Sequence, residues 1–112
     1  MITGGTRGIG FALSRAFLSS GDQVVITSKT AESIEQAEAA LVQYKDQLWA
    51  KRCDVRNRKD CQQLVQEIVQ EFGRIDILIN NAGVCADGQF YKMSGENWDH
   101  VTDTNINSLY NV

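Results

Sequence analysis

The sequence contains no proline and carries only a small net charge. Among its 112 residues, 11 Lys and Arg stand against 14 Asp and Glu, which leaves a formal charge of −3. The basic residues are scattered and form no stripe, so the composition does not support nucleic-acid binding. No apolar run approaches the ~20 residues of a membrane span, and no signal-peptide pattern opens the chain. We therefore expect neither a nucleic-acid partner nor a membrane.

Cysteine and histidine are too few, and too far apart, to form a recognisable metal site. Cys53, Cys61 and Cys85 are odd in number and lack metal-ligand spacing, which is typical of reduced thiols in a reducing compartment. The one histidine, His100, has no acid or cysteine partner nearby in the sequence and is interpreted as a packing or surface residue. We expect no metal, and a soluble protein of the cytoplasm or of an organelle stroma or matrix.

Short β-branched or apolar runs alternate with amphipathic stretches along the whole chain. Apolar spacing predicts a first helix directly after a glycine-rich loop, strands at 24–27, 48–53 and 75–79, and helices near 34–44 and 61–72. A loop follows at 84–95, and Trp98, Val101, Ile106, Leu109 and Val112 predict a last helix. Alternation of this kind predicts a Rossmann-like, doubly wound parallel sheet between two helix layers, a three-layer α/β/α arrangement. Because only Met1 and Ile2 stand where the central first strand belongs, residues 1–112 are expected to be the N-terminal part of such a domain.

The glycine-rich loop Thr3–Gly10 has the sequence TGGTRGIG. Glycine allows tight backbone turns and close approach of a phosphate, and a helix that begins there offers free N–H groups to an anion. A strand-to-helix turn also needs glycines without any ligand. On the loop alone, both interpretations stay open.

Three later motifs decide between them. Asp54-Val55 follows the third strand position, Asn80-Asn81-Ala82-Gly83 follows the fourth, and Thr104-Asn105 lies in the last helix. Together with Thr3 and the spacing Gly-x-x-x-Gly-x-Gly, this order resembles the short-chain dehydrogenase/reductase family over the whole chain.

The resemblance implies a set of cofactor-binding residues. It places Gly4, Thr6, Arg7, Gly8 and Ile9, with Gly10 in the same loop, around the pyrophosphate and adenosine ribose of a nicotinamide dinucleotide. It implies that Asp54 accepts a hydrogen bond from the adenine amino group and that Val55 lines the same pocket. Asn81, Ala82 and Gly83 are then expected along the adenosine ribose and the nicotinamide.

The end of the second strand favours NADP(H) over NAD(H). A carboxylate there would bond the ribose 2′-hydroxyl and repel a 2′-phosphate. This chain instead has Ser28 and Lys29, with no acid before Glu32, and Arg7 lies in the glycine loop. Two cations and a hydroxyl without a carboxylate suit a 2′-phosphate. The alternative is that Lys29 is simply a solvated charge.

The catalytic groups implied by the resemblance are only partly present. Asn105 matches the asparagine of a proton relay, with Asn107 as the rival position. The family's catalytic tyrosine has a lysine four residues later, which lowers its pKa, and a serine upstream. None of Tyr44, Tyr91 and Tyr110 has that lysine. The chain is thus expected to be the cofactor-binding half of a reductase and inactive by itself.

The substrate is expected to be a small-molecule carbonyl compound. The segment Asp87–Val101 resembles that of 3-oxoacyl-thioester reductases, whereas Phe17–Asp22 and Cys53–Arg56 resemble chlorophyll b reductases. Family members often pair through the last helix, so the full-length parent is expected to be a homo-oligomer, although Trp98 itself is expected in a buried helix contact. The remaining alternatives are a non-catalytic dinucleotide-binding module and an interaction protein without a ligand.

Overall fold

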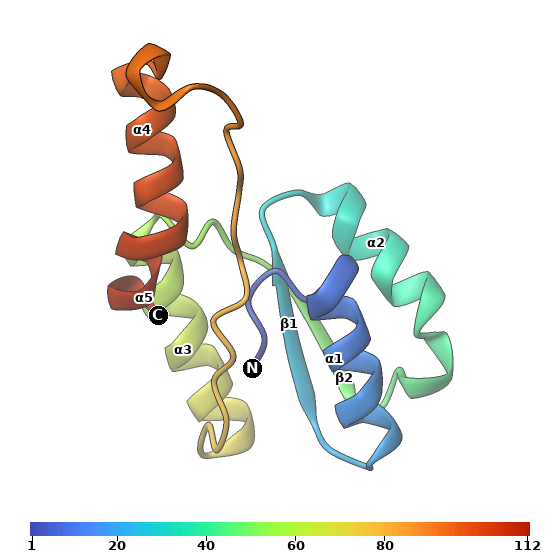
Figure 1. The fold of residues 1–112 in the computed structure, drawn as a ribbon. Helices are drawn as coiled ribbons and strands as arrows, with labels where there is room; N and C mark the ends of the chain where they lie inside the picture. Colours follow the sequence, from blue (N-terminus) through green and yellow to red (C-terminus); the bar gives the residue numbers. More distant parts are fainter.

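Helices and strands alternate along the chain in the computed structural model, which describes residues 1–112 (Figure 1). In chain order the first five regular elements are α1 Gly8–Ser19, β1 Val24–Ser28, α2 Ala31–Ala40, β2 Leu48–Arg52 and α3 Arg58–Phe72. After a long connection come α4 Gly95–Thr102, a π-helix at Asp103–Asn107 and α5 Ser108–Asn111. Short 3-10 turns at Val42–Tyr44 and Phe90–Lys92 complete the list. The order and type of the elements agree with the sequence, except that the expected strands at Ile2 and at 75–79 are reduced to single bridges.

The sheet is parallel and is built around β1. β1 and β2 pair in register from Val24 with Leu48 to Ser28 with Arg52. On the other side of β1, Ile2 forms single parallel bridges to both Ile26 and Ile79. The order across the sheet is therefore β2, β1, the Ile2 segment and the Ile79 segment. This is the central part of a Rossmann-type sheet, as the sequence predicts.

Two apolar layers cover the two faces of this sheet. Alternate residues of β1 point in opposite directions, so Val24 and Ile26 pack with Leu18 of α1 and Leu41 after α2. Val25 faces the other way, toward one face of α3, in a cluster with Cys53, Cys61, Leu64 and Ile68. Figure 1 shows α1 and α2 on one side of the strands and α3 on the other. The three-layer arrangement follows from this alternation.

Local capping fixes where the helices begin and end. The side chain of Thr30 accepts from the Ser33 amide at the start of α2, and Asn57 caps α3 by accepting from Lys59 and Asp60. α3 ends at Gly73, whose φ of +80° is the left-handed conformation that glycine favours at helix ends. No helix of the protein has the length and apolar character needed to cross a membrane.

The predicted strand at 75–79 is wrong in extent. Only Ile79 takes part in a bridge, although the Met1 ammonium donates to the Ile77 carbonyl at 2.8 Å and the Ile79 amide donates to the Met1 carbonyl at 2.9 Å. Met1 and Ile2 are the neighbours on that side, and two residues cannot pair a five-residue strand. Ile77 and Leu78 consequently remain exposed.

The apolar stripe predicted for the last helix faces outward in part. Val101 and Val112 are half-buried, but Trp98, Ile106 and Leu109 are at least half exposed. The expectation of a buried contact for Trp98 is therefore wrong; its ring packs edge-to-face on Phe90, with centroids 5.8 Å apart. The buried residues are instead Thr104 and Ser108. Their hydroxyls donate to the carbonyls of the preceding turn, so each buried hydroxyl has a hydrogen-bond partner within the helix. Small polar side chains therefore form the packed face of this helix.

Candidate functional site

An open groove of about 530 Å³ lies where the carboxyl ends of the strands meet the start of α1. It brings together every residue that the sequence assigns to cofactor binding, namely Gly4, Thr6, Arg7, Gly8, Ile9, Gly10, Ser28, Lys29, Asp54, Val55, Asn81, Ala82 and Gly83. Their binding role stays a prediction, but their convergence is a property of the fold, because parallel strands end at one edge of the sheet. A second hollow of about 370 Å³ at the opposite strand ends is mostly apolar and contains none of them.

The glycine loop is shaped by close backbone contacts. Gly4 and Gly8 have φ values of +63° and +55°, which side-chain-bearing residues rarely adopt. At Gly10 a methyl group would come within 2.4 Å of both the Gly4 carbonyl oxygen and the Asn81 amide nitrogen. The missing side chain at Gly10 thus allows α1 to start directly against the Asn81 segment.

Thr3 and Asn81 fasten the loop to the end of the outer segment. The buried Thr3 hydroxyl accepts from the backbone amides of Asn81 and Ala82 at 3.0 and 3.1 Å. In return the Asn81 side-chain amide donates to the carbonyls of Thr3 and Gly4 at 2.9 and 3.1 Å. The threonine and the asparagine of the two motifs therefore form one reciprocal lock beneath the groove.

The first turn of α1 is open to the groove. Arg7 occupies the N-cap position in an extended conformation without a side-chain cap bond, and the first turn holds no acidic residue. Nothing lies within 4 Å of the position where a Gly8 side chain would start. Free helix N–H groups and the helix dipole favour an anion at such a place.

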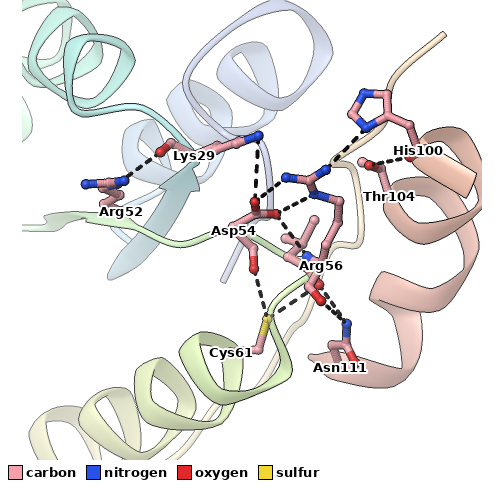
Figure 2. Close-up of polar contacts among 9 residues, drawn as sticks. Lys29, Arg52, Asp54, Arg56, Cys61, His100, Thr104 and Asn111 are labelled. Atoms are coloured by element: carbon pink, nitrogen blue, oxygen red, sulfur yellow. Dashed lines mark hydrogen bonds and ion pairs between the residues drawn. The ribbon is translucent and has the colours of Figure 1, made fainter. Parts of the chain in front are cut away.

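Asp54 is held on the opposite wall by Arg56 (Figure 2). The Arg56 backbone amide and Nε donate to Asp54 Oδ1 at 3.1 and 3.0 Å, and Nη2 donates to Oδ2 at 2.6 Å. These bonds lower the pKa of the Asp54 carboxyl to about 2 from 3.8, against the opposing effect of partial burial. Asp54 is thus ionised at neutral pH and acts as a hydrogen-bond acceptor alone.

Two further cations lie near the end of β1. Lys29 Nζ is 3.8 Å from Asp54 Oδ2 and its side chain is 61% exposed, so this ion pair is loose. Arg52 Nε donates to the Lys29 carbonyl at 3.1 Å, which fixes the backbone but leaves the lysine side chain free. The interpretation of Lys29 as a merely solvated charge is incomplete, because it faces the groove and Asp54.

Asn105 lies inside the π-helix and holds the segment that follows Gly83. Its Oδ1 accepts from the Val84 amide at 2.8 Å and its Nδ2 donates to the Val84 carbonyl at 2.9 Å. Asn107 instead donates to Asp103 on its own helix. Of the two asparagines, only Asn105 reaches the groove wall, and π turns are frequent at functional sites.

Replacing Asn105 by aspartate is expected to lower the free energy of unfolding by about 1 kcal/mol. The new carboxylate would keep the acceptor for the Val84 amide, but it would set an oxygen against the Val84 carbonyl. Asn97→Asp adds the same charge in the first turn of α4, where the helix dipole favours it, and should leave stability unchanged. Thermal unfolding measures the midpoint temperature of each variant. Equal midpoints for the two would contradict a stabilising role for the Asn105–Val84 hydrogen bonds.

The groove also contains residues that the sequence did not assign to binding, among them Arg56, His100 and Thr27. Arg56 stands two positions after Asp54, a spacing that allows a local side-chain bond and was the available signal. His100 contacts Arg56 from α4, Nδ1 to Nη1 at 3.3 Å, across 44 residues of sequence that carry no hint of the contact. Thr27 is fully buried and its hydroxyl has no hydrogen-bond partner.

Two of the three cysteines lie together in the core. Cys53 and Cys61 are buried with sulfur atoms 3.8 Å apart, and burial raises the pKa of Cys53 to about 12. Both are therefore protonated core thiols. No group of three or more His, Cys, Asp or Glu side chains is placed to hold a metal ion.

Comparison with known proteins defines the family. The family model of short chain dehydrogenases matches residues 1–112. The chain is 46% identical over 84 residues to chlorophyll(ide) b reductase NOL, chloroplastic, of Arabidopsis thaliana, covering 74% of this chain and 24% of that protein. It is 36% identical over 116 residues to the 3-oxoacyl-acyl-carrier-protein reductase FabG of Chlamydia muridarum, covering 100% and 46%.

The fold comparison agrees. A solved structure of ElxO with NADP bound superposes with a TM-score of 0.90 at 31% identity, covering 98% of this chain and 45% of that one. The chain belongs to the short-chain dehydrogenase/reductase family of oxidoreductases. It spans less than half the length of each of these three proteins.

Proposed function

We propose that this chain is the cofactor-binding part of an NADP(H)-dependent reductase that converts a carbonyl to an alcohol. The observation that carries the proposal is the composition of the groove: an uncapped helix start beside Arg7, with Lys29 and no carboxylate at the end of β1. Positive charge with free N–H groups suits a dinucleotide that bears a 2′-phosphate. The NADP-bound relative of matching fold supports the same choice.

The residues present fit such a cofactor. The glycine positions leave open space above Gly8 for a phosphate. Thr27 lines the groove, and its buried hydroxyl has no partner within the protein. Asp54, ionised at neutral pH, offers an acceptor for the amino group of a purine.

Each part of the groove then has a distinct role. The α1 amides hold the pyrophosphate oxygens, Arg7 and Lys29 neutralise the 2′-phosphate, and the Asn81–Gly83 segment orients the rest of the dinucleotide. The bound cofactor supplies the hydride. Asn105, whose side chain is fixed by Val84, is the residue we propose for the proton relay. We assign no substrate contact and no role in excluding water to these groove residues.

A 3-oxoacyl thioester is the proposed substrate. The resemblance through Asp87–Val101 and the identity to a 3-oxoacyl reductase support it. A second candidate is reduction of a chlorophyll b-type carbonyl, favoured by the higher identity to a chlorophyll(ide) b reductase over 84 residues. Assay of the full-length protein with both substrate classes separates them.

Turnover is proposed to need residues that this chain lacks. No tyrosine has a lysine four positions later, and an unshifted phenol is a poor base at neutral pH.

The outward apolar face of α4 and α5, with Trp98, Leu109 and Tyr110 exposed, is consistent with homo-oligomer formation by the whole protein.

Fluorescence titration with NADPH and NADH tests the cofactor assignment. The wild-type chain is expected to bind NADPH more tightly, and Arg7→Ala and Lys29→Ala should each weaken NADPH binding by about tenfold to hundredfold, because each removes a charge-assisted phosphate contact. Affinity for NADH should change little. Lys59→Ala, which removes a charge from α3 outside the groove, is the matched control.

Three results would contradict the proposed function in different ways. Equal affinity for both cofactors, unaffected by Arg7→Ala and Lys29→Ala, would overturn NADP(H). Absence of binding at millimolar concentrations of either cofactor would favour an interaction protein without a dinucleotide. Binding without reductase activity in the full-length protein would favour a non-catalytic module.

A further inference from the structure

The Arg56 side chain joins two parts of the groove wall, Asp54 and α4, and the resemblance assigns it no role. It stands in the loop between β2 and α3, and its guanidinium contacts Asp54 on one side and α4 on the other (Figure 2). A planar guanidinium that forms two parallel bonds to a carboxylate fixes the plane of that carboxylate as well as its charge. The orientation of Asp54 therefore depends on Arg56.

The bonding pattern leaves one oxygen of Asp54 available. Oδ1 accepts from both the Arg56 amide and Nε, which uses its two lone pairs. Oδ2 accepts one hydrogen bond, from Nη2, and has Lys29 Nζ at 3.8 Å, beyond hydrogen-bond distance. One acceptor position on Oδ2 is free, so Arg56 selects which atom of Asp54 a ligand meets.

Arg56 is itself fixed by contacts from α4 and α5. Nη1 lies 3.3 Å from His100 Nδ1, and because arginine only donates, Nδ1 is the acceptor and the imidazole proton lies on Nε2. The Asn111 side-chain amide donates to the carbonyls of Val55 and Arg56 at 2.9 and 3.3 Å. The loop that carries Asp54 is thus held by one residue of α4 and one residue of α5, on either side of Asn105.

Lys29 cannot supply the same constraint. Its ammonium is a point charge on a flexible stem, it is largely exposed, and it makes no hydrogen bond to Asp54. It is free to turn toward a phosphate without releasing the carboxylate. The two cations beside Asp54 therefore have different roles: Lys29 is free to move, and Arg56 is fixed by its hydrogen bonds.

We propose that Arg56, held by His100 and Asn111, is the positioning residue that presents Asp54 Oδ2 to the 6-amino group of the cofactor's adenine. This inference rests on the proposed dinucleotide function. It adds that the chain distinguishes adenine from other purines, and that the discrimination depends on a residue that need not itself touch the base.

The test compares NADPH with its hypoxanthine analogue, in which a carbonyl oxygen replaces the 6-amino group. The wild-type chain should bind the adenine form about tenfold more tightly or better, because the analogue loses a charge-assisted hydrogen bond. In Arg56→Gln this ratio should fall toward one. Asp54→Asn should reduce or reverse the preference, because its amide can donate to the carbonyl oxygen. Arg58→Gln, which removes a neighbouring guanidinium that contacts only Tyr110, should keep the wild-type ratio.

The ratio separates positioning from a general structural role, since a merely distorted loop would weaken both cofactors alike. Retention of the wild-type ratio in Arg56→Gln would overturn the inference, as would a wild-type chain that binds both cofactors equally; either result leaves dinucleotide binding intact. A wild-type chain that binds neither cofactor would overturn the proposed function itself. Should Arg56→Gln fail to fold, Arg56→Lys carries the same expectation, because an ammonium keeps the charge but cannot form the two parallel bonds.

Discussion

Replacing Gly10 by alanine is expected to lower the free energy of unfolding by about 3 kcal/mol. Alanine normally stabilises a helix relative to glycine by about 1 kcal/mol, so the expected sign is the opposite of the usual one. The reason is steric: the added methyl would lie 2.4 Å from the Gly4 carbonyl oxygen and from Asn81 Nδ2. The first neighbour is backbone, and the second cannot withdraw without breaking its bonds to Thr3 and Gly4.

Gly95→Ala provides the matched control. Gly95 begins α4, and nothing lies within 4 Å of the position of its missing side chain, so alanine should be neutral or slightly stabilising there. Chemical denaturation of both variants gives the comparison. If Gly10→Ala unfolded at the same denaturant concentration as the wild type, the close packing of α1 against Asn81 would be wrong.

Replacing Thr3 by valine is expected to lower the free energy of unfolding by about 3 kcal/mol. Valine has the shape of threonine but no acceptor, so the Asn81 and Ala82 amides would lose their bonds to the Thr3 hydroxyl in a partly buried position. Unpaired amides of this kind are costly because nothing replaces the lost water. Hydrogen exchange at these two amides should accelerate along with the loss of stability.

Thr3→Ser separates the hydroxyl from the methyl. Serine keeps the acceptor and should cost only about 1 kcal/mol for the lost methyl group. A valine variant no less stable than the serine variant would show that the hydroxyl does not hold the loop. The same pair, titrated with NADPH, would report whether the lock also shapes the groove.

Much of the architecture is encoded locally. The β-branched run of β1, the asparagine cap of α3 and the glycine that ends it are local signals, and the structure has elements at those places. The residues predicted to bind the cofactor come from three short motifs and the end of β1, and they meet because parallel strands end at a common edge. Neither inference needs knowledge of long-range contacts.

What could not be predicted depends on such contacts. The outer strand at 75–79 has a strand-like sequence, but its pairing is limited by the two residues beside it. Trp98 has the spacing of a core residue, yet Thr104 and Ser108 are the buried residues, and their hydroxyls tolerate burial because they bond within the helix. The contact of His100 with Arg56 joins residues that share no pattern in the sequence.

The Thr3–Asn81 lock has a consequence for the order of folding. Its bonds join positions 78 residues apart in the chain, so they form only once α1, β1, β2 and α3 have been brought into place between them. Closing so long a loop carries an entropic cost that nearby contacts do not. We therefore expect the glycine loop to remain unfixed until the sheet is assembled. If the loop binds an anion as proposed, that ability should form late in folding.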